Sequence, residues 1–205
     1  MSWNVKAKGA SAADVLGNLD DSKRTKLLSQ AVNKTARDAR VALARAVQAE
    51  VAFPNSAVSA QDERLYISKY ASPASLKAVI TARGRATSLA RFATTKPKVN
   101  TPGVTVEVEP GSPRFMARAF LIKLPQGTSP ITDTQFNLAL AVRLPKGQTL
   151  KNKNASRVSR GLYVLYGPSV AQVLENNAGT GVAKDMAPEI AGDLSAEIVR
   201  LLELS

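Results

Sequence analysis

The segment at residues 161–170 constrains the fold of this 205-residue chain, because it predicts a strand, a turn and a helix start in direct succession. The side chains at 162–166 are Leu, Tyr, Val, Leu and Tyr, which suit a pleated and largely buried surface. Gly167 allows the backbone to bend, and Pro168 fixes φ at a value that suits a first helical turn. We expect Tyr166 to bury its ring while Gly167 and Pro168 set the angle of the helix. Such a joint either serves packing alone or forms an edge against which another molecule docks.

Residues 20–51 carry the longest helical pattern in the chain. Leu, Val and Ala recur there at steps of three and four, with Lys and Arg in the gaps. Asp20 and Asp21 suit the positive N-terminal end of a helix, and Pro54 follows its predicted end. About 30 residues span roughly 45 Å as a helix, so we expect this one to cross a whole sheet or to project from it. Its stripe of small residues allows close approach by its own sheet or by another subunit.

The remaining patterns predict an α+β fold. Residues 54–75 are polar and read as a connection with a short helical turn near 60–67, and residues 143–160 read as an exposed basic loop. Alternating apolar residues predict strands at 76–83, 85–92, 104–108, 114–124 and 137–144. Helical spacing returns after residue 170 and again at 182–204, where Pro188 limits the start of the regular part.

These patterns predict one domain at residues 20–205, preceded by an N-terminal extension at residues 1–19. In this domain a mainly antiparallel sheet at residues 76–166 packs against the long N-terminal helix and the C-terminal helix. The C-terminal helix is acidic and is a fitting electrostatic partner for the basic first helix, in the same subunit or in a neighbour.

The formal net charge is +12, from 28 basic and 16 acidic residues. Residues 1–100 hold 17 Lys or Arg and 7 Asp or Glu, whereas residues 101–205 hold 11 and 9. The N-terminal half of the sequence therefore carries most of the surplus. A surplus of this size attracts nucleic acid, an anionic membrane or an acidic protein surface, and composition alone does not separate the three.

Cysteine and histidine are both absent, which excludes disulfides, thiol nucleophiles, the usual zinc sites and imidazole acid–base chemistry. Carboxylates alone can still support hydrolysis or hold magnesium, but the pairs at 20–21 and 62–63 lie in polar stretches and read as capping or solvated groups. No phosphate-binding glycine loop is present. We therefore expect no enzyme activity, no cofactor and no metal. The start of the sequence has no long apolar stretch, and no run of about 18 apolar residues occurs, so we expect no membrane partner.

Six short segments, in a fixed order along the chain, carry information beyond the composition. The set comprises AVNKTARDAR at 31–40, LKAVI at 76–80, ATSLARF at 86–92, GVTVEV at 103–108, AFL at 119–121 and LYGPSV at 165–170. This order resembles the prophage minor tail protein Z family, the tail completion proteins of long-tailed bacteriophages. The resemblance extends over residues 20–204, and the turn at 165–170 and the segment at 89–92 are its most distinctive parts.

The resemblance implies a structural virion protein at the head-proximal end of the tail, needed for head–tail joining. It implies a ring of identical copies, a hexamer, whose partners are tail-terminator, tail-tube or neck proteins. The protein would be found in the virion and, during assembly, in the host cytoplasm. The residues expected to contact neighbouring subunits or rings are Arg85, Ser88, Arg91, Phe92, Tyr166, Pro168 and Ser169.

The alternative is a basic protein that binds nucleic acid without sequence preference. Four cations are the candidates for contact with phosphate or with an acidic surface: Lys146, Lys151, Lys153 and Arg157. A second basic segment with the same potential holds Arg83, Arg85, Arg91, Lys96 and Lys98. The basic segments lack interleaved aromatic residues, which argues against base stacking and against recognition of a specific sequence.

Overall fold

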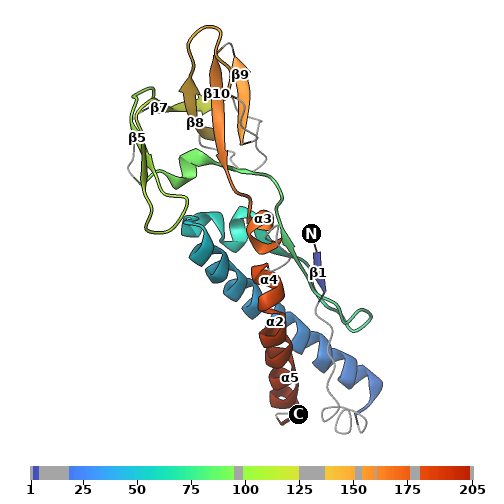
Figure 1. Cartoon of the computed structure of the whole chain (residues 1–205). Helices are drawn as coiled ribbons and strands as arrows, with labels where there is room; N and C mark the ends of the chain where they lie inside the picture. The colour runs from blue at the N-terminus through green and yellow to red at the C-terminus, as the bar shows by residue number, and fades with distance from the viewer. Residues whose placement is uncertain are drawn as a thin grey trace. The chain divides into compact units, whose positions relative to one another are not determined.

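In a computed structural model, the chain folds into two compact units (Figure 1). The structure describes residues 2–4, 19–94, 99–124, 137–150, 154–159, 161–175 and 181–203. Unit 1 combines Met1–Val47, Val58–Arg83 and Val170–Ser205. Unit 2 combines Gln48–Ala57 and Gly84–Ser169. The residues expected to form a single domain from 20 onward are thus distributed over both units.

The described residues contain both α-helices and antiparallel sheets, which confirms the predicted α+β class. The strands do not form the one sheet expected at residues 76–166. They form a three-stranded sheet in the order β1-β3-β2, a five-stranded sheet in the order β4-β10-β8-β7 with β9 also paired to β10, and a two-stranded sheet of β5 and β6. The first of these belongs to unit 1 and the other two to unit 2.

The longest element is helix α2, Asp21–Glu50, which confirms the helix predicted at 20–51. Its buried residues recur every three or four positions from Leu27 to Val47, as one face of a helix in a core requires. Asp21 lies in the first turn, where a carboxylate interacts favourably with the helix dipole, and Arg24 pairs with it.

The core of unit 1 lies between α2 and the C-terminal helix. Small residues of α2, Ala31, Val32 and Ala36, cluster there with Leu194 and Ile198, and all five are at most 4% exposed. The two helices lie side by side in Figure 1, and residues flanking the β2–β3 connection complete the cluster. Because the side chain of alanine is short, it allows the backbones of α2 and the C-terminal helix to approach closely. The small-residue stripe therefore packs within its own subunit, one of the two alternatives open from the sequence.

The C-terminal segment forms two helices, α4 (Val182–Asp185) and α5 (Ala187–Glu203). The break lies at Met186, directly before the first turn of α5 that contains Pro188. Proline is tolerated in a first turn, because its missing N–H would have no partner there. The expected limit that Pro188 sets on the regular part is confirmed.

The three-stranded sheet of unit 1 comprises β1 (Ser2–Asn4), β2 (Leu65–Lys69) and β3 (Val79–Ala82). β3 lies within the strand predicted at 76–83. The helical turn expected near 60–67 is only partly present, as two 3-10 turns, η1 (Asn55–Ala57) and η2 (Ala60–Asp62), precede a strand. The strand begins at Leu65, which is fully buried, and burial decreases along the strand toward Lys69, so no alternation marks it in the sequence. Residues 2–4 of the expected N-terminal extension pair with β3.

The main sheet of unit 2 comprises β4 (Thr87–Ser88), β7 (Ala119–Leu124), β8 (Asn137–Arg143), β9 (Ala155–Ser159) and β10 (Leu162–Gly167). β7 and β8 are adjacent and antiparallel, in agreement with the antiparallel pairing predicted for the sheet. The strand expected at 85–92 ends at residue 88 and continues as a 3-10 turn, η3 (Leu89–Phe92). The loop expected at 143–160 contains β9, whose exposed side chains gave no apolar alternation to reveal it.

The second sheet of unit 2 is a hairpin of β5 (Val104–Val106) and β6 (Arg114–Met116). The single strand expected at 114–124 is therefore two strands, because β6 pairs with β5 whereas β7 pairs with β8. The turn that joins the strands of the hairpin contains Gly111 at a φ of 77°, a backbone conformation that glycine adopts without strain.

Candidate docking surfaces

The joint at residues 161–170 has the predicted order of strand, turn and helix. β10 ends at Gly167, Pro168 and Ser169 follow, and helix α3 (Val170–Glu175) begins at the next residue. Ser169 belongs to unit 2 and Val170 to unit 1, so the chain passes from one unit to the other at this point.

Packing, and not a bend, accounts for glycine at position 167. Gly167 is still part of β10, where it pairs with Thr87, and it is not among the glycines with positive φ. A Cβ at this position would lie 2.8 Å from Cε2 of Phe92 and 3.4 Å from Cδ1 of Leu89. The expectation that Gly167 bends the backbone is therefore wrong, and glycine serves there to let the Phe92 ring approach the strand.

The seven residues predicted to contact other subunits differ in accessibility. Arg85 is exposed. Four others are half-buried: Ser88, Arg91, Tyr166 and Pro168. Phe92 is 3% exposed and Ser169 is 0% exposed. The prediction fails for these last two side chains, because both are buried in the folded chain; the Phe92 ring packs 5.3 Å from the ring of Phe53, centroid to centroid.

The structure does bring two of the predicted residues together. Ser88 and Tyr166 are cross-strand partners on β4 and β10, although 78 positions separate them in the sequence. The Ser88 hydroxyl donates a hydrogen bond of 3.2 Å to the carbonyl of Leu138. Tyr166 is only half-buried, and Tyr163 is the tyrosine whose ring the sheet buries, at 6% exposure. The expectation that Tyr166 buries its ring is therefore wrong.

The predicted phosphate contacts fall on one end of the main sheet of unit 2. Lys146 and Arg157 are both exposed. Lys151 and Lys153 lie outside the described residues, as do Lys96 and Lys98 of the second basic segment. Sequence reasoning missed two further cations at the same end, Arg118 and Arg143, which are also exposed. Arg143 stands three residues before Lys146, at the start of the predicted basic loop, whereas Arg118 is placed at this end only by the pairing of β7 with β8.

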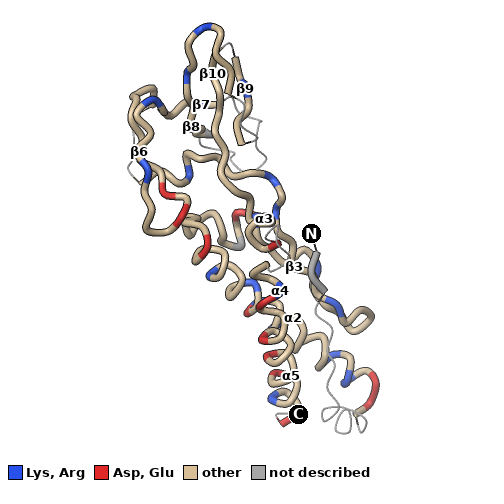
Figure 2. The backbone as a smooth tube through the Cα atoms, viewed as in Figure 1, with Lys and Arg blue, Asp and Glu red and all other residues tan. Residues whose placement is uncertain are grey.

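Charge is distributed between the two units very unevenly. Unit 1 contains 15 basic and 12 acidic residues, whereas unit 2 contains 13 basic and 4 acidic residues. Unit 2 therefore carries a net charge of +9 out of the total of +12. Figure 2 shows blue but no red segments along the described parts of β7 to β10. The positive field of this protein thus originates mainly in unit 2.

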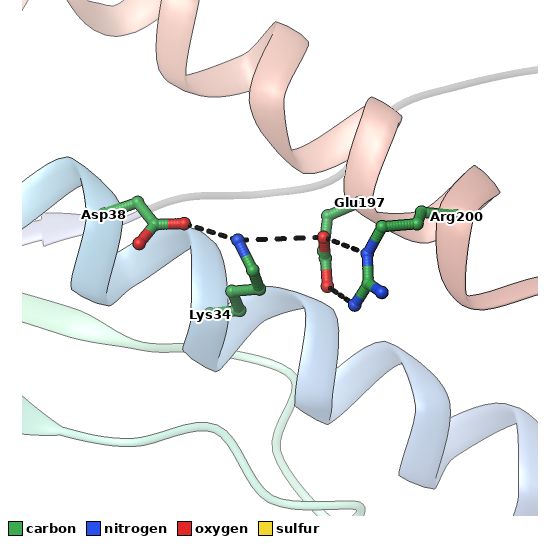
Figure 3. Close-up of polar contacts among 4 residues, drawn as sticks. All are labelled: Lys34, Asp38, Glu197 and Arg200. Carbon is green, nitrogen blue, oxygen red and sulfur yellow. Dashed lines mark hydrogen bonds and ion pairs between the residues drawn. The ribbon is translucent and has the colours of Figure 1, made fainter.

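In unit 1, opposite charges are joined by an ion-pair clamp between α2 and α5 (Figure 3). Glu197, 8% exposed, accepts hydrogen bonds from Nε and Nη2 of Arg200 at 2.9 and 2.7 Å. Lys34 lies on α2 with its Nζ 3.8 Å from Glu197, and it donates to Asp38 at 2.7 Å. The acidic C-terminal helix therefore pairs with the basic first helix of the same subunit.

The clamp keeps its groups in their charged forms. Hydrogen bonds from Arg200 hold the pKa of Glu197 below its ordinary value, although burial acts in the opposite direction. The hydrogen bond to Asp38 and the charge of that carboxylate raise the pKa of Lys34, with a smaller contribution from Glu197. A carboxylate ionised and held in this way acts as a structural partner of the opposite helix and is poorly suited to proton transfer. Among the described residues no group of three or more acidic side chains is placed to hold a metal ion.

The most exposed large apolar side chain of the described residues is Phe115 on β6, at 69% exposure. Its ring extends over Gly103, where a Cβ would lie 3.1 Å from Cζ of the ring. It borders an open groove with Leu89, Val106 and Met116. We call this surface the Phe115 groove. The lining also includes Glu109, Ser112 and Arg114. Exposed aromatic side chains beside a partly apolar groove are typical of surfaces that bind another protein.

Comparisons with protein-family models, with curated proteins and with solved structures find no match to this chain. The helices in the described part of the chain do not combine the length and the apolar character that a membrane span requires.

Proposed function

We propose that this chain is a structural subunit of a long-tailed bacteriophage, which completes the tail and joins it to the head. It acts in a ring of identical copies, a hexamer, at the head-proximal end of the tail, next to tail-terminator, tail-tube or neck proteins. The ordered segments of the tail completion family supply the biological setting of this proposal. The Phe115 groove is the observation that supports assembly through protein contacts.

An exposed Phe115 favours a role in association. Burial of a phenylalanine side chain contributes about 1.5–3 kcal/mol, and this chain leaves most of that contribution unrealised within its own fold. Aromatic residues at the centre of an interface commonly dominate its binding energy. In a ring each copy presents one surface to the next copy, so the occupant of the Phe115 groove is a second copy of this chain.

A role in assembly also agrees with the kinds of residue present. The sequence has no histidine or cysteine, and the best-buried carboxylate of α5, Glu197, is engaged by Arg200 and Lys34. We accordingly propose a protein that acts through its surfaces, without catalysis and without a cofactor.

Replacement of the exposed aromatic tests this function. Phe115→Ser should shift the purified full-length protein from a multimer toward the monomer in sedimentation velocity, with an unchanged melting temperature. Tyr70→Ser is the matched control, since Tyr70 is the other aromatic side chain of the described residues that is mostly exposed, at 53%, but it lies in unit 1. It should assemble like the wild type. In co-sedimentation with phage tails, Tyr70→Ser should again behave like the wild type, and Phe115→Ser should bind less.

Two results together would contradict the proposal. The first is a wild-type protein that remains monomeric at high concentration. The second is a failure to sediment with tails or neck complexes, which excludes assembly on a partner as well.

A further inference from the structure

Four cations lie at or near one end of the five-stranded sheet of unit 2, with Arg157 on the face of the sheet opposite to Arg143. Ala119 pairs with Val142 on β7 and β8, so the preceding Arg118 falls opposite Arg143 at the end of β8. Arg143 pairs with Leu162 at the start of β10, and Tyr163, one residue on, pairs with Arg157 of β9. Lys146 follows β8 in the turn closed by the amide of Gln148 and the carbonyl of Pro145.

We call Arg118, Arg143, Lys146 and Arg157 the basic rim. Strands in a sheet lie about 4.8 Å apart, so the order β7, β8, β10, β9 distributes the rim over roughly 14 Å. This length corresponds to about four base-pair steps of a duplex.

Within the described part of the chain, the rim has no acidic partner. Each of its four side chains is exposed, and among the described residues none of them forms an ion pair with Asp or Glu. The sequence has no acidic residue from position 134 to position 174. Arg157 donates a long hydrogen bond of 3.5 Å to the carbonyl of Ser159. Like charges held together without partners repel one another, and a polyanion relieves that repulsion.

We infer that the basic rim binds the sugar–phosphate backbone of a nucleic acid without reading its sequence. Three of the four cations are arginines, whose planar guanidinium groups match phosphate in a bidentate manner. The rim contains no aromatic side chain to stack on bases, so its contacts go to the backbone.

An acidic protein surface fits this rim less well than phosphate does. Protein interfaces draw their affinity from apolar and aromatic anchors in a dehydrated centre, where charged residues are depleted. The rim offers charge alone, apart from the exposed Val158 beside Arg157. Charge alone suffices for nonspecific binding of nucleic acid, since that binding derives from released counterions.

The test compares two variants of equal net charge. The rim variant changes all four rim residues to Gln. The control variant changes four exposed cations of α2 to Gln: Lys23, Lys26, Arg37 and Arg45. Binding of a fluorescent 20-base-pair duplex to the full chain is measured by anisotropy between 50 and 200 mM NaCl. Thermal melts verify the fold of each variant, and Lys146→Glu serves as a milder single change in the rim.

The wild type and the control should bind with the same salt dependence. The rim variant should have a slope of log affinity against log salt that is shallower by about 3 to 4, since each phosphate contact contributes about 0.9. Between 50 and 200 mM NaCl the wild type should then lose roughly 100-fold more affinity than the rim variant does. Changing the three rim arginines to Lys should preserve the salt dependence, because the charge is retained, and should weaken binding less than the change to Gln does.

Three outcomes would overturn the inference. They are no binding by the wild type at 50 mM NaCl, an equal loss of slope in the control variant, and competition by poly-glutamate as effective per charge as competition by DNA. The last result would assign the rim to an acidic protein. The inference does not depend on the proposed role in the tail, because it concerns the isolated protein and a duplex, whereas Phe115→Ser tests assembly.

Discussion

Replacement of Gly167 by alanine tests whether the joint is built on close packing. The new Cβ would lie 2.8 Å from Cε2 of Phe92, closer than non-bonded carbon atoms approach without strain. The Phe92 ring cannot easily move, because it is 3% exposed and packs against Phe53 at 5.3 Å between centroids. The new Cβ would also lie 3.4 Å from Cδ1 of Leu89, so the added methyl group has little room on that side either.

Two opposing effects determine the size of the change. Extra atoms in a well-packed core cost about 1–3 kcal/mol. Replacement of glycine by alanine also restricts the unfolded chain, which stabilises the native state by about 0.4–1 kcal/mol where the backbone conformation permits it. The expected net loss for Gly167→Ala is about 1–2 kcal/mol, and Gly167→Val should lose more because its two further methyl groups meet the same ring. For a chain of this size, 1 kcal/mol lowers the melting temperature by about 2–4 °C.

Scanning calorimetry of the full chain measures the effect, since two units can unfold in separate transitions. Gly84→Ala is the matched control in the same unit, because no heavy atom lies within 4 Å of its Cβ. It should melt at or slightly above the wild-type temperature. The penalty of Gly167→Ala should shrink in a Phe92→Leu background, because the two changes share one contact. An unchanged melting temperature for Gly167→Ala, or an equal penalty in both backgrounds, would refute the packing explanation.

The remaining predictions concern α5 and its clamp. Because the pKa of Glu197 is lowered in the folded state, its ionised form stabilises the protein above the ordinary carboxyl pKa of 4.5, and this stabilisation is lost as pH falls through the lowered value. Melting temperatures between pH 7 and pH 3 should therefore fall less for Glu197→Gln than for the wild type. Gly192→Ala should raise the free energy of unfolding by about 0.5–1 kcal/mol in urea titration, because Gly192 is exposed inside the helix and has open space around its Cβ. A loss of stability on Gly192→Ala would indicate that this helix face is covered.

The elements that could be predicted from the sequence each carry a long periodic pattern. Helix α2 has buried apolar residues on one face from Leu27 to Val47, and the β7–β8 pair has two apolar runs separated by residues 125–136. The joint at residues 161–170 combines a buried strand with a proline, and both signals are local. Local chemistry of this kind fixes the type of an element, and burial of its apolar face confirms it.

The elements that were missed have short or exposed patterns. β9 is exposed along most of its length, and β2 has only five residues inside a polar stretch. The burial of Phe92 and Ser169 could not be predicted either, because it depends on contacts with residues far away in the sequence. The same holds for Arg118 of the basic rim, which only the pairing of β7 with β8 places at the same end of the sheet as the rim residues of the predicted basic loop.

The fold also changes where the charge of this protein acts. Counted along the sequence, the N-terminal half has the surplus, with 17 basic against 7 acidic residues. Counted by unit, the cations of α2 share unit 1 with 12 of the 16 acidic residues, and some pair with them directly, as Lys34 does with Asp38 and Arg24 with Asp21. Paired charges contribute little field at a distance, since each ion is screened by its partner. An anionic partner should therefore approach unit 2, which bears three quarters of the net charge, even though most of the basic residues of the sequence lie outside it.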